Sequence, residues 1–297
     1  MSQTTTIKRG NTTASVDSMG AQLTSLTYNG AEYLWQADPA FWNKHAPILF
    51  PIVGSLRDGK AQSAQGPCTM ARHGVARIFE HQLLGVSDDG ATATYELVDN
   101  DETLAAYPYH FKLNMIYSIT DEATLSQTFR VTNTGDADLP FSVGGHPAFN
   151  VPVPGAQDEA FEDYTIKFTQ AWTGKAPIIK PDGLMTFEGA YDAPANSDHV
   201  DITHRSFDND AIMFTDVPGS TLTLLGTKSG HGIRCDFADF RYIGVWSAAN
   251  DAPFVALEPW SAHTTMDSED DVLEHKENFS TLAPGESRDF TFTITVF

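Results

Sequence analysis

The sequence predicts an all-β protein, built as a large antiparallel β-sandwich. Apolar and polar residues alternate over long stretches, and this period-two pattern recurs along the whole chain. Turn-forming residues interrupt the pattern about every ten residues, which is a spacing typical of strands in all-β domains. Sustained helical periodicity is nearly absent, and no strand–helix–strand rhythm predicts a parallel sheet.

Three segments show the alternation most clearly. Residues 111–119 place every second side chain, beginning with Phe111, on one apolar face. Residues 125–132 and 290–296 follow the same pattern, so each segment is predicted to be a strand with one buried and one solvent-facing side. The sequence YNGA, residues 28–31, contains the Asn-Gly pair that is typical of a tight hairpin turn.

Helical structure is expected only in short pieces. Residues 267–278 begin with an acidic run, and we expect a short helix there because acidic side chains stabilise the positive end of the helix dipole. Residues 39–45 are expected to form one or two turns, and the turn-rich residues 151–163 a long loop. No linker-like change of composition divides the chain, so residues 1–297 are expected to form a single domain.

Composition excludes several classes of function. The 297 residues carry a net charge of −21, and an acidic surface repels nucleic acids and anionic membranes. No apolar run reaches about 18 residues, the length that a membrane-spanning helix needs. The N-terminal residues lack the apolar core of a signal peptide, so a cytoplasmic location is expected. Cys68 and Cys235 should then be free thiols, and neither lies in a CxxC pair that would predict zinc or redox chemistry.

The most informative segment is FSVGGHPAFN, residues 141–150. Its His146 follows two glycines, which permit backbone angles that other residues resist, and it precedes Pro147, which restricts the exit of the chain. An imidazole held rigidly at a strand end suits proton transfer, because it titrates near neutral pH. Glu258 has a similar setting, since it ends the apolar run FVALE and precedes Pro259. The sequence thus supplies a placed acid and a placed base.

Other polar side chains have two interpretations each. His73 lies in the segment MARHGVAR between Arg72 and Arg77, and Arg57 lies in a turn framed by proline and glycine. These arginines either bind a substrate or pair with some of the many carboxylates of the chain. Asp210, in SFDNDAIMF, either stabilises a turn or lines a site.

Several aromatic side chains are candidates for stacking on a ring-shaped ligand, namely Trp35, Phe149, Trp246 and Trp260. An aromatic side chain in a sandwich is more often part of the core. Phe149 and Trp260 have the stronger case, because they adjoin His146 and Glu258 in the sequence. His263 follows Glu258 closely in the sequence and is a further candidate for the same pocket. The sequence lacks the closely spaced pair of histidines, such as HExxH, that would predict a metalloenzyme.

Five segments together resemble the aldose 1-epimerase (mutarotase) family, and especially its branch of LacX-like, galactose-mutarotase-related proteins. In chain order they are PIVGSLRDG, RHGVAR, GGHPAFN, FDNDAIMF and VALEPW. Each motif alone has little specificity. Five motifs in the family's order, over roughly residues 23–284, are strong evidence for the resemblance. The resemblance implies a galactose-mutarotase-like β-sandwich, which agrees with the strand pattern.

The resemblance also implies a reaction, the interconversion of the α and β anomers of a free hexose by ring opening and closure. Glu258 corresponds to the base that takes the proton from the C1 hydroxyl, and His146 to the acid that protonates the ring oxygen. His73 and Asp210 correspond to substrate-binding residues, and Arg57 falls near the family's arginine. Proton transfer at two oxygens needs a carboxylate, an imidazole and fixed geometry, so no metal or other cofactor is expected.

Three further residues, Arg77, Trp260 and Phe149, are expected to line the same substrate site. A small aldose is the partner that the sequence predicts. The chain departs from the better-known galactose mutarotases at Pro147 and Ala148, where those proteins carry an NHxYFN type of segment. This departure predicts a substrate preference that differs from theirs.

Three other functions fit parts of the same pattern. A hexose-6-phosphate mutarotase would bind the phosphate with Arg57, Lys60, Arg72 and Arg77. A glycoside hydrolase would use Asp210 and Glu258 as its pair of carboxylates. A carbohydrate-binding or sensor protein would keep the aromatic side chains and Asp210 but would not need both His146 and Glu258.

Overall fold

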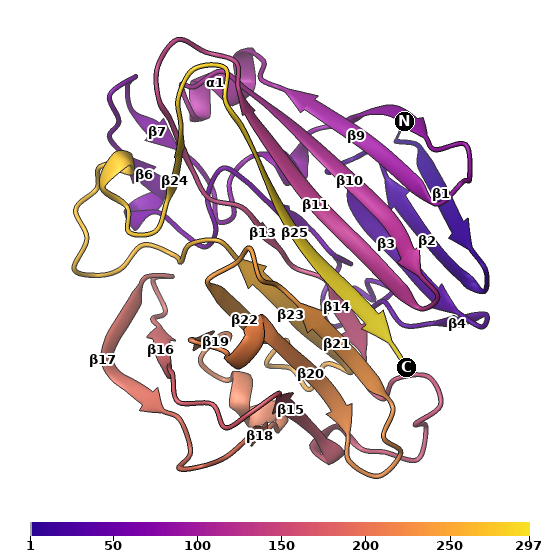
Figure 1. Cartoon of the computed structure of the whole chain (residues 1–297). Coiled ribbons are helices and arrows are strands. Elements are labelled where there is room, and N and C mark those ends of the chain that lie inside the picture. The colour runs from indigo at the N-terminus through magenta and orange to yellow at the C-terminus, as the bar shows by residue number, and fades with distance from the viewer. Residues whose placement is uncertain (1) are drawn as a thin grey trace.

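The computed structural model describes residues 2–297, and antiparallel strands form most of its regular structure (Figure 1). The largest sheet has nine strands. In spatial order they are β18 (His199–Asp201), β15 (Tyr164–Phe168), β20 (Thr221–Gly226), β21 (Gly232–Asp236), β25 (Ser287–Val296), β11 (Thr124–Asn133), β10 (Phe111–Asp121), β9 (Thr92–Val98) and β8 (Gln82–Val86).

Two smaller sheets complete the main architecture. A six-stranded sheet contains β19 (Ile212–Thr215), β22 (Tyr242–Trp246), β23 (Phe254–Trp260), β13 (Gly144–Gly145), β5 (Ile48–Leu49) and β14 (Ala148–Asn150). A four-stranded sheet contains β1 (Thr4–Arg9), β2 (Thr12–Asp17), β3 (Gln22–Tyr28) and β4 (Ala31–Glu32). The remaining strands form two-stranded ladders, namely β6 (Lys60–Ala61) with β7 (Cys68–Thr69), β12 (Leu139–Phe141) with β24 (Ser280–Leu282), and β16 (Lys175–Ile179) with β17 (Met185–Asp192).

Helical structure is limited to short pieces. The α-helix α1 (Asp101–Ala106) begins at Asn100, whose side chain accepts hydrogen bonds from the first turn of the helix. Single 3₁₀ turns occur at Arg57–Gly59, Ala76–Ile78, Phe161–Asp163, His204–Phe207, Pro218–Ser220 and Leu273–His275. No helix in residues 2–297 combines the length and the apolar character that a membrane span requires.

The three strands that alternate most clearly in the sequence are confirmed as β10, β11 and β25, which are neighbours in the nine-stranded sheet. Their inward side chains, such as Met115, Phe129 and Phe292, are at most 1% exposed. The other sheets cover this apolar face. A Cβ on Gly145 of β13 would lie 2.7 Å from the Phe292 ring, and the Tyr117 hydroxyl of β10 donates at 2.6 Å to the carbonyl of Ala21, in the turn between β2 and β3 of the four-stranded sheet. The predicted antiparallel sandwich is therefore confirmed.

Local turn predictions have mixed outcomes. Asn29 and Gly30 connect β3 to β4 with φ angles of 52° and 79°, the left-handed backbone that the Asn-Gly pair predicted. Residues 39–45 form turns, as expected, and residues 151–163 form a loop that ends in a 3₁₀ turn. The predicted helix over residues 267–278 is wrong, because only Leu273–His275 is helical there.

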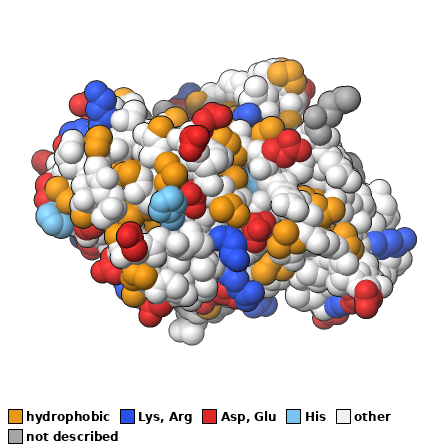
Figure 2. Space-filling view, turned by 90° about the horizontal axis from the view of Figure 1, so that it is seen from above, with side chains coloured by type: hydrophobic (Ala, Val, Ile, Leu, Met, Phe, Trp, Pro, Cys, Tyr) orange, Lys and Arg blue, Asp and Glu red, His pale blue; other side chains and the backbone are white. Residues whose placement is uncertain are grey.

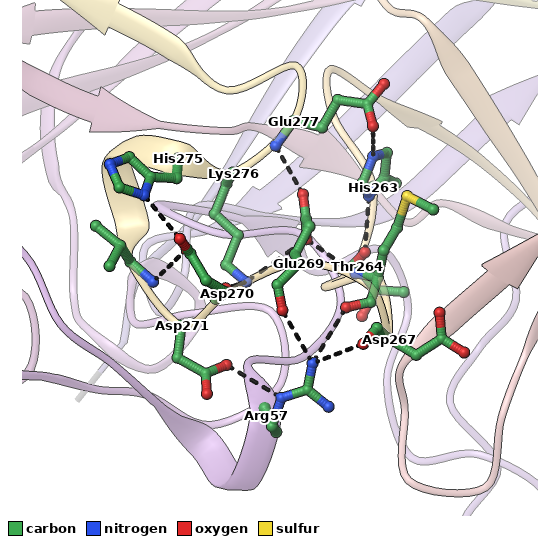
Figure 3. A network of polar contacts seen from close by, with 12 residues as sticks. Arg57, His263, Thr264, Asp267, Glu269, Asp270, Asp271, His275, Lys276 and Glu277 are labelled. Carbon is green, nitrogen blue, oxygen red and sulfur yellow. Dashed lines mark hydrogen bonds and ion pairs between the residues drawn. The ribbon is translucent and has the colours of Figure 1, made fainter.

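The contacts of Arg57 explain why the acidic segment is not a helix (Figure 3). Its guanidinium donates to three backbone carbonyls at the start of the segment, those of Met266, Asp267 and Glu269. A carbonyl that bonds to Arg57 is turned away from the amide four residues later, which an α-helix would need as its donor. The acidic residues instead fold as a loop around two cations, Arg57 and Lys276.

The surface and the thiols agree with the composition. Figure 2 shows acidic side chains dispersed over one face of the molecule rather than gathered in a single patch. Cys68 and Cys235 are both buried and unpaired, which confirms the predicted free thiols. Burial raises the pKa of the Cys68 thiol to about 11, so this side chain behaves as a neutral core group rather than as a nucleophile.

The backbone at Gly74 generates a stability prediction. Gly74 has a φ of +73°, and a Cβ there would lie 2.4 Å from the carbonyl oxygen of Phe50. We expect Gly74→Ala to lower the free energy of unfolding by roughly 2–5 kcal/mol, because left-handed strain and a backbone clash add. Gly10→Ala is the control, since Gly10 has a φ of +57° with nothing within 4 Å of its Cβ position. If urea unfolding shows that the two variants lose the same free energy of unfolding, the predicted clash at Gly74 is contradicted.

Candidate active site

Strand β23 carries Glu258, and the two short strands β13 and β14 both pair with it. The paired residues are Gly144 with Trp260 and Ala148 with Ala256. Both pairings belong to one register, which places His146, in the gap between the short strands, directly opposite Glu258. The sequence suggested that Glu258 ends a strand. In the structure β23 continues to Trp260, so Glu258 lies inside the strand.

This position brings the two candidate side chains together. The Leu257 N–H donates to the Pro147 carbonyl at 3.0 Å, so the neighbouring pair of residues, His146 and Glu258, is a non-hydrogen-bonded pair of the ladder. Side chains are closest at such pairs. His146 Nε2 lies 3.3 Å from Glu258 Oε1, a contact that the backbone pairing itself sets up.

The two glycines before His146 serve close packing. Neither Gly144 nor Gly145 has a left-handed backbone, so the explanation from backbone freedom is wrong. A Cβ on Gly144 would lie 2.9 Å from Trp260, and one on Gly145 would lie 2.7 Å from Phe292. Only glycine lets this strand approach both neighbours, and that approach positions the histidine.

Burial decides the charge of the pair. His146 is 8% exposed and Glu258 is 2% exposed. Burial, with smaller contributions from the charges of Arg72 and Arg77, lowers the pKa of His146 to about 3, against the opposing effects of its own backbone and of Asp210. Burial also raises the pKa of Glu258 well above its usual range, although Arg72 opposes that shift. Both shifts favour the form of the pair in which the Glu258 carboxyl keeps its proton and His146 is neutral.

His73 lies at the same cavity as a neutral hydrogen-bond donor. Its Nδ1 accepts the N–H of Gly54 at 3.1 Å, so in the neutral ring the proton is on Nε2. Burial holds the pKa of His73 well below 6.5, and the nearby His146, Arg72 and Arg77 act in the same direction. The His73 ring meets the His146 ring edge-on, with centroids 5.8 Å apart.

Asp210 is held by Arg72. The guanidinium makes two hydrogen bonds to the carboxylate, at 2.9 and 3.2 Å, and the Ala211 N–H adds a third at 2.8 Å. Asp210 itself has a φ of 79°, a left-handed angle that aspartate tolerates better than most residues. The ion pair joins the loop that contains Arg72 and His73 to the segment before β19, and both of its residues line the cavity.

These groups line one cavity of about 280 Å³. Its lining comprises Trp42, Asn43, Lys44, Pro47, Arg72, His73, Arg77, His146, Asp210, Ala211, Trp246, Glu258 and Trp260. Trp42 stacks on His146 with ring centroids 4.9 Å apart at 22°, and Trp246 meets the same imidazole edge-on at 5.4 Å. The cavity therefore combines aromatic walls with titratable groups, as small-molecule sites do.

Three buried polar atoms at the cavity have no hydrogen-bond partner of good geometry within residues 2–297. They are His146 Nδ1, Trp260 Nε1 and Arg77 Nε. Buried polar atoms are nearly always paired, so unpaired ones at a cavity indicate a ligand with several hydrogen-bonding groups. A ligand rich in hydroxyl groups would satisfy them.

The structure brings most of the expected site residues together. Glu258, His146, His73, Asp210, Arg77 and Trp260 all line the cavity, with Trp246 beside them. Two expected residues lie elsewhere. Arg57 pairs with Asp271 at 3.2 Å (Figure 3), and Phe149 is fully buried in the main core. Neither side chain lines the cavity, because the acidic loop binds the first and strand alternation directs the second inward.

Two other candidates also lie outside the cavity. Trp35 packs against Phe254 with ring centroids 4.9 Å apart, and His263 packs against Tyr242 at 5.4 Å. Conversely, sequence reasoning missed Trp42, Asn43 and Lys44. They lie in the 39–45 turn, and the signal available was an aromatic pair inside a predicted turn, because a loop rarely exposes two large aromatic residues without a use.

The raised pKa of Glu258 predicts a pH-dependent stability. Because burial raises the pKa of the Glu258 carboxyl, the folded protein keeps this proton to a higher pH than the unfolded chain does. The wild type therefore loses stability as pH rises from the unfolded pKa toward the folded pKa. Glu258→Gln removes that loss. Urea unfolding should show the variant gaining stability relative to wild type between pH 5 and pH 8. Glu122→Gln, at an exposed turn, is the control. A difference for Glu258→Gln that does not change with pH would contradict the buried-carboxyl assignment.

Comparison with known proteins places the chain among sugar epimerases. The family model for aldose 1-epimerase matches residues 3–295. The plasmid-encoded protein LacX of Lactococcus lactis subsp. lactis is 35% identical over 298 residues, which cover 98% of each chain, and the chromosomal LacX of the same organism matches equally well.

Two solved structures have closely similar folds. The galactose mutarotase related enzyme from Lactobacillus acidophilus is 27% identical, with a TM-score of 0.91 over 100% of this chain and 97% of that one. A galactose mutarotase-like protein from Lactobacillus casei ATCC 334 is 28% identical, with a TM-score of 0.89 over 99% of this chain and 100% of that one. The family model matches nearly the whole of this chain, so the chain belongs to the aldose 1-epimerase family.

Proposed function

We propose that this protein interconverts the anomers of a free hexose in the cavity around His146 and Glu258. The observation that carries the proposal is the buried imidazole–carboxylate pair, with Nε2 and Oε1 3.3 Å apart, at a cavity of about 280 Å³. Exchange of anomers moves one proton at the C1 hydroxyl and one at the ring oxygen. A paired acid and base on one wall can serve both oxygens of a single ring.

Ring opening follows from the ion-pair form of the two side chains. The Glu258 carboxylate takes the proton of the C1 hydroxyl, and the electrons of that O–H bond form the C1 carbonyl. The bond between C1 and the ring oxygen breaks, and its electron pair takes a proton from the His146 imidazolium. Rotation about the C1–C2 bond and reversal of these steps give the other anomer.

The pair carries one proton before and after ring opening, because Glu258 gains a proton from the C1 hydroxyl as His146 gives its own to the ring oxygen. After ring opening Glu258 is protonated and His146 is neutral, which is the form that burial favours in the free protein. This form is ready to close an open-chain aldehyde. Opening a cyclic sugar requires the proton to cross from Oε1 to Nε2, a separation of 3.3 Å. Both forms have the same net charge, so neither requires proton exchange with solvent.

Surrounding groups support the imidazolium form and the substrate. The Trp42 ring stacks on His146, and an aromatic face stabilises an adjacent cation by about 0.5–2 kcal/mol. The Nε2–H of His73 can donate to a sugar oxygen, since its Nδ1 is occupied by Gly54. Asp210, oriented by Arg72, can accept hydrogen bonds from sugar hydroxyls.

The alternative of a glycoside hydrolase is less well supported. Such an enzyme needs two carboxyl groups that are free to act as acid and as base or nucleophile. Asp210 is bound by two guanidinium hydrogen bonds and one backbone N–H, which stabilise its carboxylate and restrict its movement. The group that contacts Glu258 is an imidazole, as anomer exchange requires.

The acid and base assignments generate a direct activity test. We expect Glu258→Gln and His146→Ala each to lower the enzymatic rate of mutarotation by at least about 100-fold, because each removes one proton-transfer group. Polarimetry of freshly dissolved α-glucose and α-galactose measures the rate against the spontaneous background, at high enzyme concentration. Wild-type rates in both variants would refute the assignments.

Arg57→Gln is a suitable control for that test. Arg57 was a candidate from the sequence, but its guanidinium serves the acidic loop and does not line the cavity. We expect this variant to retain mutarotation once its folding is verified by circular dichroism. A loss as large as that of Glu258→Gln would show that the cavity is assigned to the wrong residues.

A phosphorylated hexose is a second candidate substrate. Arg77 and Lys44 line the same cavity, and neither pairs with a carboxylate in residues 2–297. If a phosphate binds there, wild type should prefer glucose 6-phosphate to glucose, and Arg77→Gln should lower kcat/KM for the phosphorylated sugar by about 10- to 100-fold more than for the free one. Equal effects on both sugars would exclude this candidate. Lys44→Gln serves as the matched second variant.

A further inference from the structure

His73 has a strained backbone that one other residue, Gly54, holds in place. Its φ angle is 71°, in the left-handed region that is uncommon for residues other than glycine. The His73 N–H donates to the Gly54 carbonyl at 2.7 Å, and the Gly54 N–H donates to His73 Nδ1 at 3.1 Å. Backbone strain that the surroundings maintain is typical of functional sites. The position of Gly54 therefore fixes both the backbone of His73 and the orientation of its ring.

Two buried hydroxyl groups hold the chain on either side of Gly54. The N–H of Val53 donates to Ser142 Oγ at 3.0 Å, and the N–H of Ser55 donates to Thr264 Oγ1 at 2.7 Å. Ser142 is 0% exposed and Thr264 is 1% exposed. A buried N–H group that loses its acceptor is costly, so the chain would have to move if either hydroxyl were removed.

Thr264 is a rigid support for Gly54. A Cβ on Gly54 would lie 2.1 Å from Thr264 Cβ, so Thr264 occupies the space that a side chain at position 54 would need. The Thr264 hydroxyl also donates to the Gly183 carbonyl at 2.7 Å. In the network of Figure 3 the ring of His263 donates to the backbone carbonyl of Thr264 at 2.8 Å. Both the side chain and the backbone of Thr264 are therefore anchored.

We propose that Ser142 and Thr264 are positioning residues for the His73 imidazole, a role that rests on the proposed anomer exchange. By fixing Gly54 they keep the ring in the tautomer and orientation in which its Nε2–H can donate to a sugar oxygen. Ser142 lies shortly before β13, in the segment that leads to His146, and Thr264 lies shortly after β23. The two segments that carry the proton-transfer pair thus also hold His73, which fixes the three groups relative to one another.

Thr264→Val tests this role, because it removes the hydroxyl and keeps the branched shape of the side chain. We expect Gly54 to shift and kcat/KM for the mutarotation of glucose and galactose to fall about tenfold, which corresponds to about 1.4 kcal/mol of lost transition-state stabilisation. The ¹⁵N resonance of His73 Nδ1 should move, because the ring loses its fixed donor. Long-range ¹H–¹⁵N correlation measures this resonance, and its absence in His73→Gln assigns it. Thr264→Ser keeps the hydroxyl and should preserve most of the rate and the wild-type resonance.

Thr265→Val is the matched control. Thr265 is 3% exposed, and it contacts the Ser55 carbonyl at 3.1 Å through its backbone N–H, which the substitution keeps. It should leave kcat/KM and the His73 resonance unchanged. Ser142→Ala removes the other hydroxyl and should change both quantities as Thr264→Val does, so the test does not depend on the folding of one variant.

The two measurements separate the positioning role from its alternatives. If Thr264→Val and Ser142→Ala lower the rate but leave the His73 resonance in place, the hydroxyls only stabilise the fold and the positioning role is refuted. The role is also refuted if neither quantity changes while the wild-type protein accelerates mutarotation. If the wild-type protein accelerates the mutarotation of neither sugar, the proposed function itself fails, and the resonance still shows whether the hydroxyls hold the ring.

Discussion

The candidate active site depends on one backbone constraint, the shared register in which β13 and β14 pair with β23. This register makes His146 and Glu258 a non-hydrogen-bonded pair, whose side chains lie on one face and as close as an antiparallel ladder allows. The register in turn depends on Gly144 and Gly145, because any larger residue would separate β13 from Trp260 and Phe292. Packing of the core against a glycine strand is therefore what sets the geometry of the proposed proton transfer.

Burial gives this pair its chemical character. In water a carboxylate and an imidazole titrate independently, whereas here burial disfavours both charged forms and so favours a neutral pair, with Nε2 and Oε1 3.3 Å apart. The surroundings are fixed by separate elements: Gly54 holds His73, and Arg72 holds Asp210. A preorganised polar site of this kind would reorganise little during the proposed reaction, and such electrostatic preorganisation is usually the largest single contribution to catalysis.

Sequence reasoning succeeded where chemistry and pattern are local. The period-two alternation identified β10, β11 and β25, and the Asn-Gly pair identified the β3–β4 turn, because each signal comes from neighbouring residues. Reasoning failed where distant segments decide the outcome. The acidic segment looked like a helix start, but Arg57, more than 200 residues away, binds its carbonyls. Trp42 gave no local sign that it would stack on an imidazole about 100 residues further along the chain.

By itself, the sequence determined the fold class, the family and the two residues proposed to transfer protons, since alternation, turn chemistry and ordered motifs are all written along the chain. Only the tertiary structure decided how the site is assembled. It excluded Arg57 and Phe149, added Trp42 and the Arg72–Asp210 pair, and placed Gly54 between two buried hydroxyl groups. The physical reason is that burial, strand register and cavity shape arise from contacts between segments far apart in the sequence, which no local pattern encodes.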